Sequence, residues 1–265
     1  MIMKISLDLN KSIEENASAY FEKAKKARKK IKGAEEAVGK LKKRLEKEQA
    51  KLEEKLRKQE EEENSAQKTR KLEWYEKFRW FISSEGFLVI GGRDSTTNEI
   101  IIKKHTDSND IIFHTDMAGS PFFVIKNPDN KEIGEQTITE TADATCTYSK
   151  AWKLGLATTS VFWVKPDQVS KEAESGEYMA KGAFMIRGKT NYIPAKINLA
   201  IGSMEDSRVM GGPLSAVKEN CKAYVEVVQG NDKTAAVAKK VKAKIGDVDL
   251  DDIIKVIPAG GAKIK

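Results

Sequence analysis

The chain has 265 residues and a formal net charge of +7, with 33% charged and 7% aromatic residues. This length suits one sizeable domain with an extension, or two small domains. Its two cysteines, Cys146 and Cys221, are too few and too far apart for a zinc site or a disulfide framework, which favours a reducing compartment. The sequence has neither an apolar run of the roughly 20 residues that span a bilayer nor a signal peptide, so we expect a soluble, cytoplasmic protein with no membrane partner.

The positive charge is concentrated in the first quarter of the chain. Residues 1–70 hold 20 Lys and Arg against 14 Asp and Glu, a net charge of +6, whereas the remainder holds 27 against 26. Such a basic excess favours a polyanion such as nucleic acid as partner, because phosphates are neutralised and counterions are released. A second interpretation stays open, in which the lysines only keep a solvated helix in solution.

A long helix is predicted near the N-terminus. Residues Lys4–Leu9 alternate apolar and polar side chains and predict a short strand, and Ser12 to Glu15 then have the form of a capping box. Apolar residues follow at a 3.5-residue period with charged flanks, which indicates a coiled coil whose apolar seam needs a covering partner. The two sets of heptad positions are Ala17, Ala24, Ile31, Val38, Leu45, Leu52 and Ile13, Tyr20, Ala27, Ala34, Leu41.

The face opposite this seam is strongly basic. Seven of the ten residues from Lys23 to Lys32 are Lys or Arg. If the partner is RNA, the side chains expected to contact its phosphates are Lys25, Lys26, Arg28, Lys29 and Lys30. The heptad pattern is lost at Glu60–Ser65, where we expect a frayed or bent section, and a helix is predicted again over Lys68–Phe81.

After Gly86 the apolar pattern changes to the two-residue period of strands. The predicted strands are Phe87–Gly91, Glu99–Lys104, Ile111–Thr115, Phe122–Lys126, Val161–Lys165, Ala183–Arg187, Ile193–Ala200 and Tyr224–Val228. The predicted helices are Glu135–Leu154 and Lys233–Ile245, whereas Leu250–Ile257 fits either state. Because the strands are mostly adjacent in sequence, the predicted fold class is α+β, with a mainly antiparallel sheet in a mixed α/β domain. Residues 1–70 are predicted to form the short strand and the basic coiled-coil helix, and residues 71–265 the globular domain.

No catalytic or metal-binding motif stands out. The turn Gly91-Gly92-Arg93 lacks the spacing of dinucleotide and phosphate loops. His114 and Asp116 would project to the same side of a strand, as acid–base chemistry or a metal would require. The chain has only two histidines, however, and neither has a second ligand at a typical spacing. We therefore expect a structural histidine, no cofactor, no metal and no enzymatic activity.

The basic residues of the domain gather in two predicted turns between strands, Gly92-Arg93-Asp94 and Arg187-Gly188-Lys189. Since Arg and Lys bind phosphates and Arg planes stack on splayed bases, the two turns would make one RNA-binding patch if their strands are neighbours. Taken singly, each turn is better explained as a solvent-exposed connection. Further basic residues are Arg79, Lys103 and Lys104. Three aromatic residues are expected in the core, where they would dock the helix on the sheet: Trp74, Trp80 and Phe81.

Four segments occur in order between Trp74 and about Ile201: WYEKFRWF, GGRDSTTNE, IIFHTDMAGSPFFVIK and VFWVKPDQVSKEAESGEYMAKGAFMIRGKTNYI. Together they resemble the NFACT-R domain of the NEMF/RqcH family of ribosome-associated quality-control factors, particularly its archaeal members. The preceding stretch, KISLDLNKSIEENASAYFEKAKKARKKIKGAEEA, resembles the second arm of the family's coiled-coil region.

This resemblance implies a specific function. Full-length members of the family bind the large ribosomal subunit that carries a stalled peptidyl-tRNA, recruit tRNA, and support untemplated extension of the C-terminus of the nascent chain. The peptidyl transfer is the ribosome's own, so such a factor is not an enzyme in the ordinary sense. On this sequence the implied RNA contacts fall first on Arg93, Asp94 and Asn98, and next on His114, Asp116, Arg187 and Lys189.

Nothing in the sequence resembles the family's N-terminal NFACT-N domain or its first coiled-coil arm. We therefore expect a fragment of a longer protein, whose apolar seam is covered by the missing arm or by a second copy of the chain. The alternative is a natural short protein, a stand-alone nucleic-acid-binding or protein-interaction module that is not dedicated to the ribosome.

Overall fold

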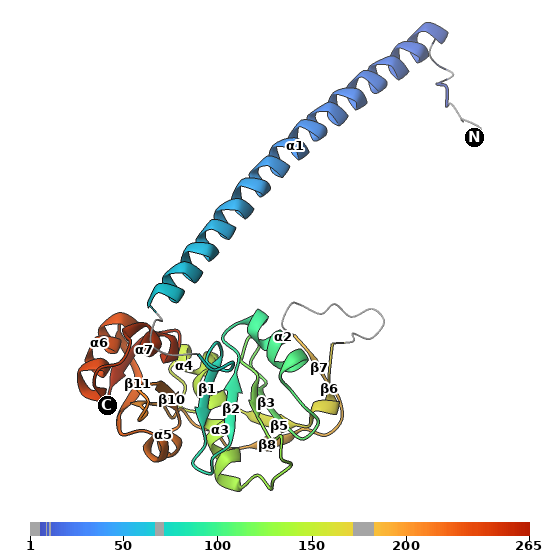
Figure 1. Ribbon diagram of the computed structural model, residues 1–265. Helices are drawn as coiled ribbons and strands as arrows, with labels where there is room; N and C mark the ends of the chain where they lie inside the picture. The colour runs from blue at the N-terminus through green and yellow to red at the C-terminus, as the bar shows by residue number, and fades with distance from the viewer. Residues whose placement is uncertain (1–5, 9, 11, 67–71, 172–182) are drawn as a thin grey trace. The chain divides into compact units, whose positions relative to one another are not determined.

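The computed structural model describes residues 6–8, 10, 12–66, 72–171 and 183–265, and of residues 43–66 it describes the backbone. The chain divides into two compact units, Met1–Lys71 and Leu72–Lys265. Each unit has its own secondary structure, shown in Figure 1, and each is described by itself.

The first unit is built on one helix, α1 (Ile13–Ala66), of 54 residues. The capping box predicted at its start is confirmed: the Glu15 amide donates to the Ser12 hydroxyl (3.1 Å) and the Ser12 amide donates to the Glu15 carboxylate (2.8 Å). The chain before the helix is held to it by the Tyr20 hydroxyl, which donates to the Ser6 carbonyl (2.7 Å). Residues 6–8 therefore form no strand, and the rest of the strand predicted over Lys4–Leu9 lies outside the described residues.

The helix continues without interruption through the segment Glu60–Ser65, so the loss of the heptad pattern does not end it there. Its apolar seam is open along the part whose side chains are described. Ile13, Ile31, Val38 and Leu41 are all more than half exposed. The five basic residues predicted to contact phosphates are exposed as well: Lys25, Lys26, Arg28, Lys29 and Lys30.

The second unit contains a six-stranded antiparallel sheet. Its strands, in the order in which they pair, are β1 (Arg79–Ile82), β2 (Leu88–Gly91), β4 (Phe123–Ile125), β3 (Ile111–Thr115), β5 (Val161–Val164) and β8 (Asn191–Ile193). One face is covered by α3 (Glu135–Thr147), which packs against β3, β4 and β5. The core of this half holds Phe81, Phe113 and Phe123, each 0% exposed.

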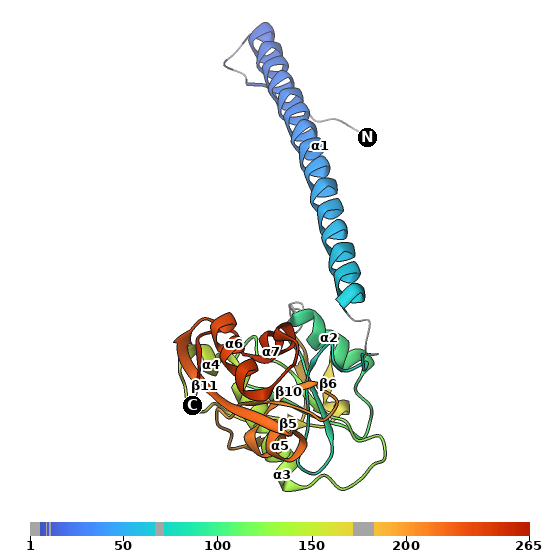
Figure 2. The same cartoon turned by 60° about the vertical axis from the view of Figure 1, so that its left-hand side comes forward.

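A four-stranded antiparallel sheet completes the second unit, with the order β10 (Val209–Gly212), β9 (Ala200–Ser203), β11 (Ala223–Asp232) and β12 (Ala262–Ile264). Figures 1 and 2 show α6 (Thr234–Ile245) and α7 (Leu250–Val256) together beside β11. The first sheet and the second meet through β1, which packs against β10 and against α5 (Leu214–Asn220). Smaller elements are α4 (Lys150–Leu154), the 3-10 turn Pro166–Gln168 and the pair β6 (Val169–Ser170) and β7 (Met185–Ile186).

The predicted α+β class with mainly antiparallel strands is therefore confirmed, but the strand predicted over Glu99–Lys104 is wrong. These residues form α2 (Ser95–Lys104). Three consecutive isoleucines favoured a strand, yet Asp94 caps the helix: its carboxylate accepts from the Thr97 amide (2.8 Å), and the Thr97 hydroxyl accepts from the Asp94 amide (2.9 Å). A reciprocal cap of this kind outweighs a β-propensity that depends strongly on context.

The helix predicted over Lys68–Phe81 is also wrong where the chain is described, because Arg79–Ile82 is the edge strand β1 and the residues before it form turns. Residues 67–71 lie outside the description. Trp80 and Phe81 are buried as expected, whereas Trp74 is 43% exposed and stacks on His105 with ring centroids 4.7 Å apart.

Two longer predictions are divided by the structure. The helix predicted over Glu135–Leu154 breaks at Tyr148, and the hydroxyl of Ser149 caps a separate short helix. Of the strand predicted over Ile193–Ala200, only the two end residues lie in strands. Ile193 ends β8 and Ala200 begins β9, and these strands belong to different sheets. The remaining predicted strands and the helix over Lys233–Ile245 are confirmed, and the ambiguous segment after Asp249 is the helix α7. Within the described residues, no helix has the length and apolar character needed to cross a membrane.

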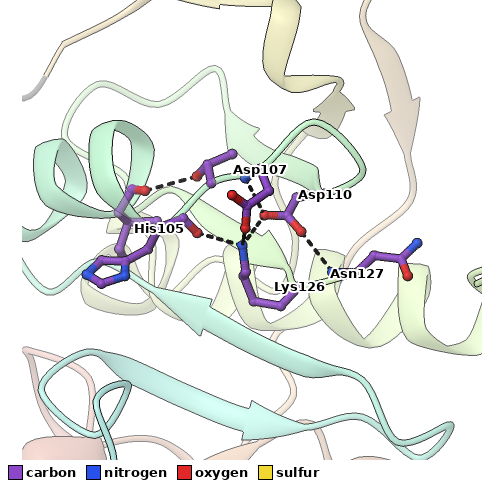
Figure 3. A network of polar contacts seen from close by, with 7 residues as sticks. His105, Asp107, Asp110, Lys126 and Asn127 are labelled. Atoms are coloured by element: carbon purple, nitrogen blue, oxygen red, sulfur yellow. Dashed lines mark hydrogen bonds and ion pairs between the residues drawn. The ribbon is translucent and has the colours of Figure 1, made fainter. Parts of the chain in front are cut away.

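A buried ion pair fixes the start of β3 to the end of β4 (Figure 3). The Lys126 ammonium group contacts the fully buried carboxylate of Asp110, and it also donates to the Asp107 carboxylate (2.8 Å) and to the His105 carbonyl (2.9 Å). The second oxygen of Asp110 accepts from the Asn127 amide at 2.8 Å. The hydrogen bond and charge of Lys126 lower the pKa of Asp107. The network thus closes the loop Thr106–Asp110 onto the sheet.

We expect Lys126→Met to destabilise the second unit by about 3–5 kcal/mol, because the variant leaves the Asp110 carboxylate buried without a cation. Urea unfolding followed by tryptophan fluorescence measures the free energy. The matched control is Lys131→Met, since Lys131 pairs with Asp129 between side chains that are 68% and 65% exposed. Surface pairs contribute little, so the control should stay close to the parent. Equal effects of the two variants would contradict the structural role of the Lys126 pair.

Candidate nucleic-acid interface

Four of the residues predicted to contact RNA line one pocket of about 390 Å³. These are Arg93, Asp94, Asn98 and His114. The pocket lies at the first turn of α2, between the loop that follows β3 and the segment that includes β7. Other lining residues include Arg79, Gly92, Ser120, Phe122, Tyr148 and Phe184.

Arg93 follows β2 and is half-buried. Its guanidinium group donates to the carbonyls of Phe78 (3.0 Å) and Glu76 (3.3 Å), so the backbone before β1 holds the side chain in place. Burial lowers the pKa of Arg93. Its buried Nε has no hydrogen-bond acceptor among the described residues. Arg93 therefore sits in the pocket wall with its Nε–H group unsatisfied by the described residues.

Asp94 and Asn98 hold the pocket together from within. Asp94 caps α2, and the Asn98 amide group both accepts from the Phe122 amide (3.1 Å) and donates to the Ser120 carbonyl (3.3 Å). Gly92 is required beside it, because a Cβ there would lie 1.8 Å from the Asn98 side-chain oxygen. The RNA contacts predicted for Asp94 and Asn98 stay predictions, and what the structure assigns to both is a positioning role.

His114 and Asp116 have different partners. The His114 ring stacks on Phe122 at 4.1 Å, with 23° between the planes, and its Nε2 lies 3.3 Å from the Ser120 carbonyl. Burial lowers the pKa of His114, which keeps the ring neutral at pH 7. Asp116 instead accepts from the Tyr192 hydroxyl (3.1 Å) and is not among the lining residues.

The turns Gly92-Arg93-Asp94 and Arg187-Gly188-Lys189 were predicted to form one patch if their strands are neighbours. The strands that flank the two turns are not neighbours in a sheet. Arg187 and Lys189 are exposed between β7 and β8, and their carbonyls accept from the Gln168 side chain at 2.9 Å each. In the large sheet β8 is separated from β2 by three strands, and β7 pairs only with β6 among the described strands. Ile186, directly before Arg187, does line the pocket.

Lys103 and Lys104 lie in the last turn of α2, at the other end of the helix from the pocket. Both are exposed, and Lys103 pairs with Glu99 at 3.2 Å. The two lysines do not line the pocket, and they are connected to it only through α2. Their predicted contacts with RNA phosphates stay predictions.

Sequence reasoning named Arg79 only among the basic residues and did not select Tyr148, yet both lie in the pocket. The Arg79 guanidinium group lies 4.2 Å from the centre of the Tyr148 ring. Tyr148 is half-buried, the desolvation of its hydroxyl raises its pKa to about 12, and that hydroxyl donates to the Val256 carbonyl (2.9 Å). A lone tyrosine in a predicted helix carries no sequence signal for such a position.

Metal and thiol chemistry have no visible site in the described part of the chain. It holds no group of three or more His, Cys, Asp or Glu side chains that could bind a metal ion. Burial raises the pKa of Cys146 to about 11 and that of Cys221 to about 12, so both thiols stay protonated at neutral pH.

The buried ring of His114 predicts a pH dependence of stability. Because burial lowers the folded-state pKa of His114, the unfolded chain binds its proton first as the pH falls below about 6.5, the unfolded value. The free energy of unfolding should therefore decrease from pH 7 towards pH 5. Denaturant unfolding at several pH values should show a shallower decrease in His114→Gln than in the parent. An unchanged slope would contradict a buried, neutral His114.

Comparison with known proteins places this pocket in a recognised domain. Residues 77–188 match the family model described as NFACT protein RNA binding domain. The archaeal Rqc2 homolog aRqcH of Methanocaldococcus jannaschii is 42% identical over 213 residues, which cover 77% of this chain and 31% of that protein. The ribosome quality control complex subunit NEMF of Homo sapiens is 44% identical over 183 residues, covering 68% of this chain and 16% of that protein.

A NEMF homolog of the same complex in Drosophila melanogaster is 41% identical over 192 residues, covering 72% of this chain and 19% of that protein. The chain thus spans less than a third of the length of these curated relatives. The matched domain extends from the edge strand β1 to the turn after β7, and so includes Arg79, Arg93 and His114. The chain belongs to the NEMF/RqcH family of NFACT proteins.

Proposed function

We propose that the chain is the RNA-contacting C-terminal part of a ribosome quality-control factor. In this proposal it binds tRNA and the rRNA of a stalled large ribosomal subunit and supports untemplated tailing of the nascent chain. The observation that carries it is the position of the pocket: Arg79, Arg93 and His114 all lie within the segment that matches an RNA-binding domain. The names of the relatives support the ribosomal setting.

The proposal divides RNA binding between the two units. The exposed basic residues of α1 bind RNA phosphates regardless of the RNA sequence, because their side chains project into solvent. The described part of the apolar seam of α1 is exposed as well. The pocket of the second unit, together with the exposed Arg187 and Lys189, binds at a defined place. No step of bond making is assigned to this chain, because the peptidyl transfer belongs to the ribosome. We place its action in the cytoplasm, where the ribosome is.

A second element of the proposal is a helical partner for α1. Exposed apolar residues at heptad spacing, such as Ile31 at 59% and Val38 at 52%, cost free energy in water and favour a covering helix. The partner is either another arm of the same protein or a second copy of the chain. A stand-alone module that pairs with other proteins is the alternative function that this same seam favours.

The basic stretch of α1 gives the first test. We expect replacement of Lys25, Lys26, Arg28, Lys29 and Lys30 by Gln to weaken binding to tRNA and to large subunits. The slope of log affinity against log salt should become shallower by up to about 0.7–0.9 for each phosphate that the variant no longer neutralises. Filter binding from about 50 to 200 mM salt measures the slope. Replacing Lys239 and Lys244 of α6 by Gln is the control, and an unchanged slope in the α1 variant would contradict the phosphate contacts.

The seam gives the second test. If a second copy covers the seam, sedimentation of the full chain should show a concentration-dependent dimer. Ile31→Glu together with Val38→Glu should abolish it, because the charges would be buried in the pair. Arg28→Glu together with Lys29→Glu on the basic stretch is the matched control. A strict monomer at every concentration would rule out self-pairing and leave another arm of the same protein, or another protein, as the partner.

A further inference from the structure

Two arginines face the same pocket from adjacent strands. Arg79 begins β1, and the pairing of β1 with β2 places it opposite Gly91, two residues before Arg93. The Arg79 guanidinium group rests on the Tyr148 ring at 4.2 Å and reaches the Lys255 carbonyl at 3.5 Å. The Arg93 guanidinium group donates to two backbone carbonyls. Uncharged groups therefore hold both cations in position.

Among the described residues neither arginine forms a direct ion pair with a carboxylate, and the negative charges of Asp252 and Asp94 act on Arg93 only from beyond contact distance. The Asp94 carboxylate, which borders the pocket, accepts from the Thr97 amide in its capping role. Burial lowers the pKa of both arginines, and the Arg93 cation lowers that of Arg79 further. Buried charges in proteins are normally paired or coordinated. Two neighbouring, half-buried cations at one pocket are therefore suited to an anionic group that enters from outside.

The opposite part of the pocket is aromatic and neutral. His114 stacks on Phe122, and Phe184 meets Phe122 edge-on at 5.4 Å. Phe122 itself is only 2% exposed, so the rings on which a nucleobase can stack are those of the half-buried His114 and Phe184. The volume of about 390 Å³ is in the range of pockets that accept small ligands. A ligand with an anion at one end and a flat ring at the other fits both parts.

We propose that the pocket receives one unpaired nucleotide of an RNA chain, with a phosphate between Arg79 and Arg93 and the base against His114 and Phe184. This inference rests on the proposed RNA binding and deepens it, because it names what enters the pocket. The half-buried arginines act at one nucleotide, whereas the lysines of α1 act along the backbone. RNA that is fully base-paired cannot supply such a nucleotide without opening a base pair.

The first test needs no variant. Titration of the full chain with adenosine 5′-monophosphate should shift the NMR signals of the Arg93 Nε–H group and of the residues around His114. Adenosine alone and inorganic phosphate alone, each with one half of the ligand, should bind at least about tenfold more weakly, the value of one charge-assisted hydrogen bond. If inorganic phosphate binds as tightly as the nucleotide, the base site is overturned. If the NMR signal of Arg93 does not shift, the whole proposal is overturned.

The second test uses variants that keep the charge. Arg79→Lys and Arg93→Lys remove the planar fork of donors, so each should weaken adenosine 5′-monophosphate and single-stranded RNA by about tenfold or more. Binding of a duplex of the same length should be unchanged. The control Lys239→Arg, a charge-preserving change at an exposed position of α6, should leave nucleotide binding unchanged. A thermal melt of each variant checks the fold.

The outcomes separate this inference from the proposed function. If Arg79→Lys and Arg93→Lys bind the nucleotide and single-stranded RNA as the parent does, while neutralising the basic stretch of α1 still removes binding to tRNA, the pocket proposal is overturned and RNA binding stands. If the parent binds the nucleotide but neither tRNA nor large subunits, the proposed function is overturned instead.

Discussion

The side-chain amide of Asn98 is the contact on which the candidate site depends. It is buried, and it joins the first turn of α2 to the backbone on both sides of Pro121 through the Ser120 carbonyl and the Phe122 amide. Leaving either backbone group buried and unsatisfied would cost about 1–3 kcal/mol. The same contact requires glycine at position 92, and it places Phe122 where His114 can stack on it. The Asn98 side chain thus fixes three parts of the pocket relative to one another: the first turn of α2, Gly92 and Phe122.

Two modes of RNA recognition are combined in the proposal, and they differ physically. Exposed lysines on α1 act through counterion release, which is strong at low salt and indifferent to sequence. Arg79 and Arg93 are half-buried against a ring and backbone carbonyls, so salt screens their charges less and their geometry is fixed. The first mode would supply affinity and fast association, and the second a defined position on the RNA.

Much of the fold was predictable because it follows from periodicity and local signals. The capping box at Ser12, the long helix and most strands were found in this way. The segment Glu99–Lys104 was not, because a run of isoleucines suggests a strand until the cap at Asp94 is known to form. Arg93, Asp94, Asn98 and His114 were chosen mainly from family resemblance. Arg79 and Tyr148 join them only through the order of strands and the packing of α3, which no local pattern encodes.

All lining residues of the pocket lie within the segment by which the domain is recognised, but groups that support two of them lie far beyond it. The Tyr148 hydroxyl donates to the carbonyl of Val256, and Arg79 reaches that of Lys255, at the end of α7. The matched segment ends at residue 188, before the second sheet begins. A boundary drawn by sequence similarity would therefore cut away groups that orient both the tyrosine and the arginine. The segment recognised by sequence similarity is thus shorter than the folded unit that the pocket needs to keep its shape.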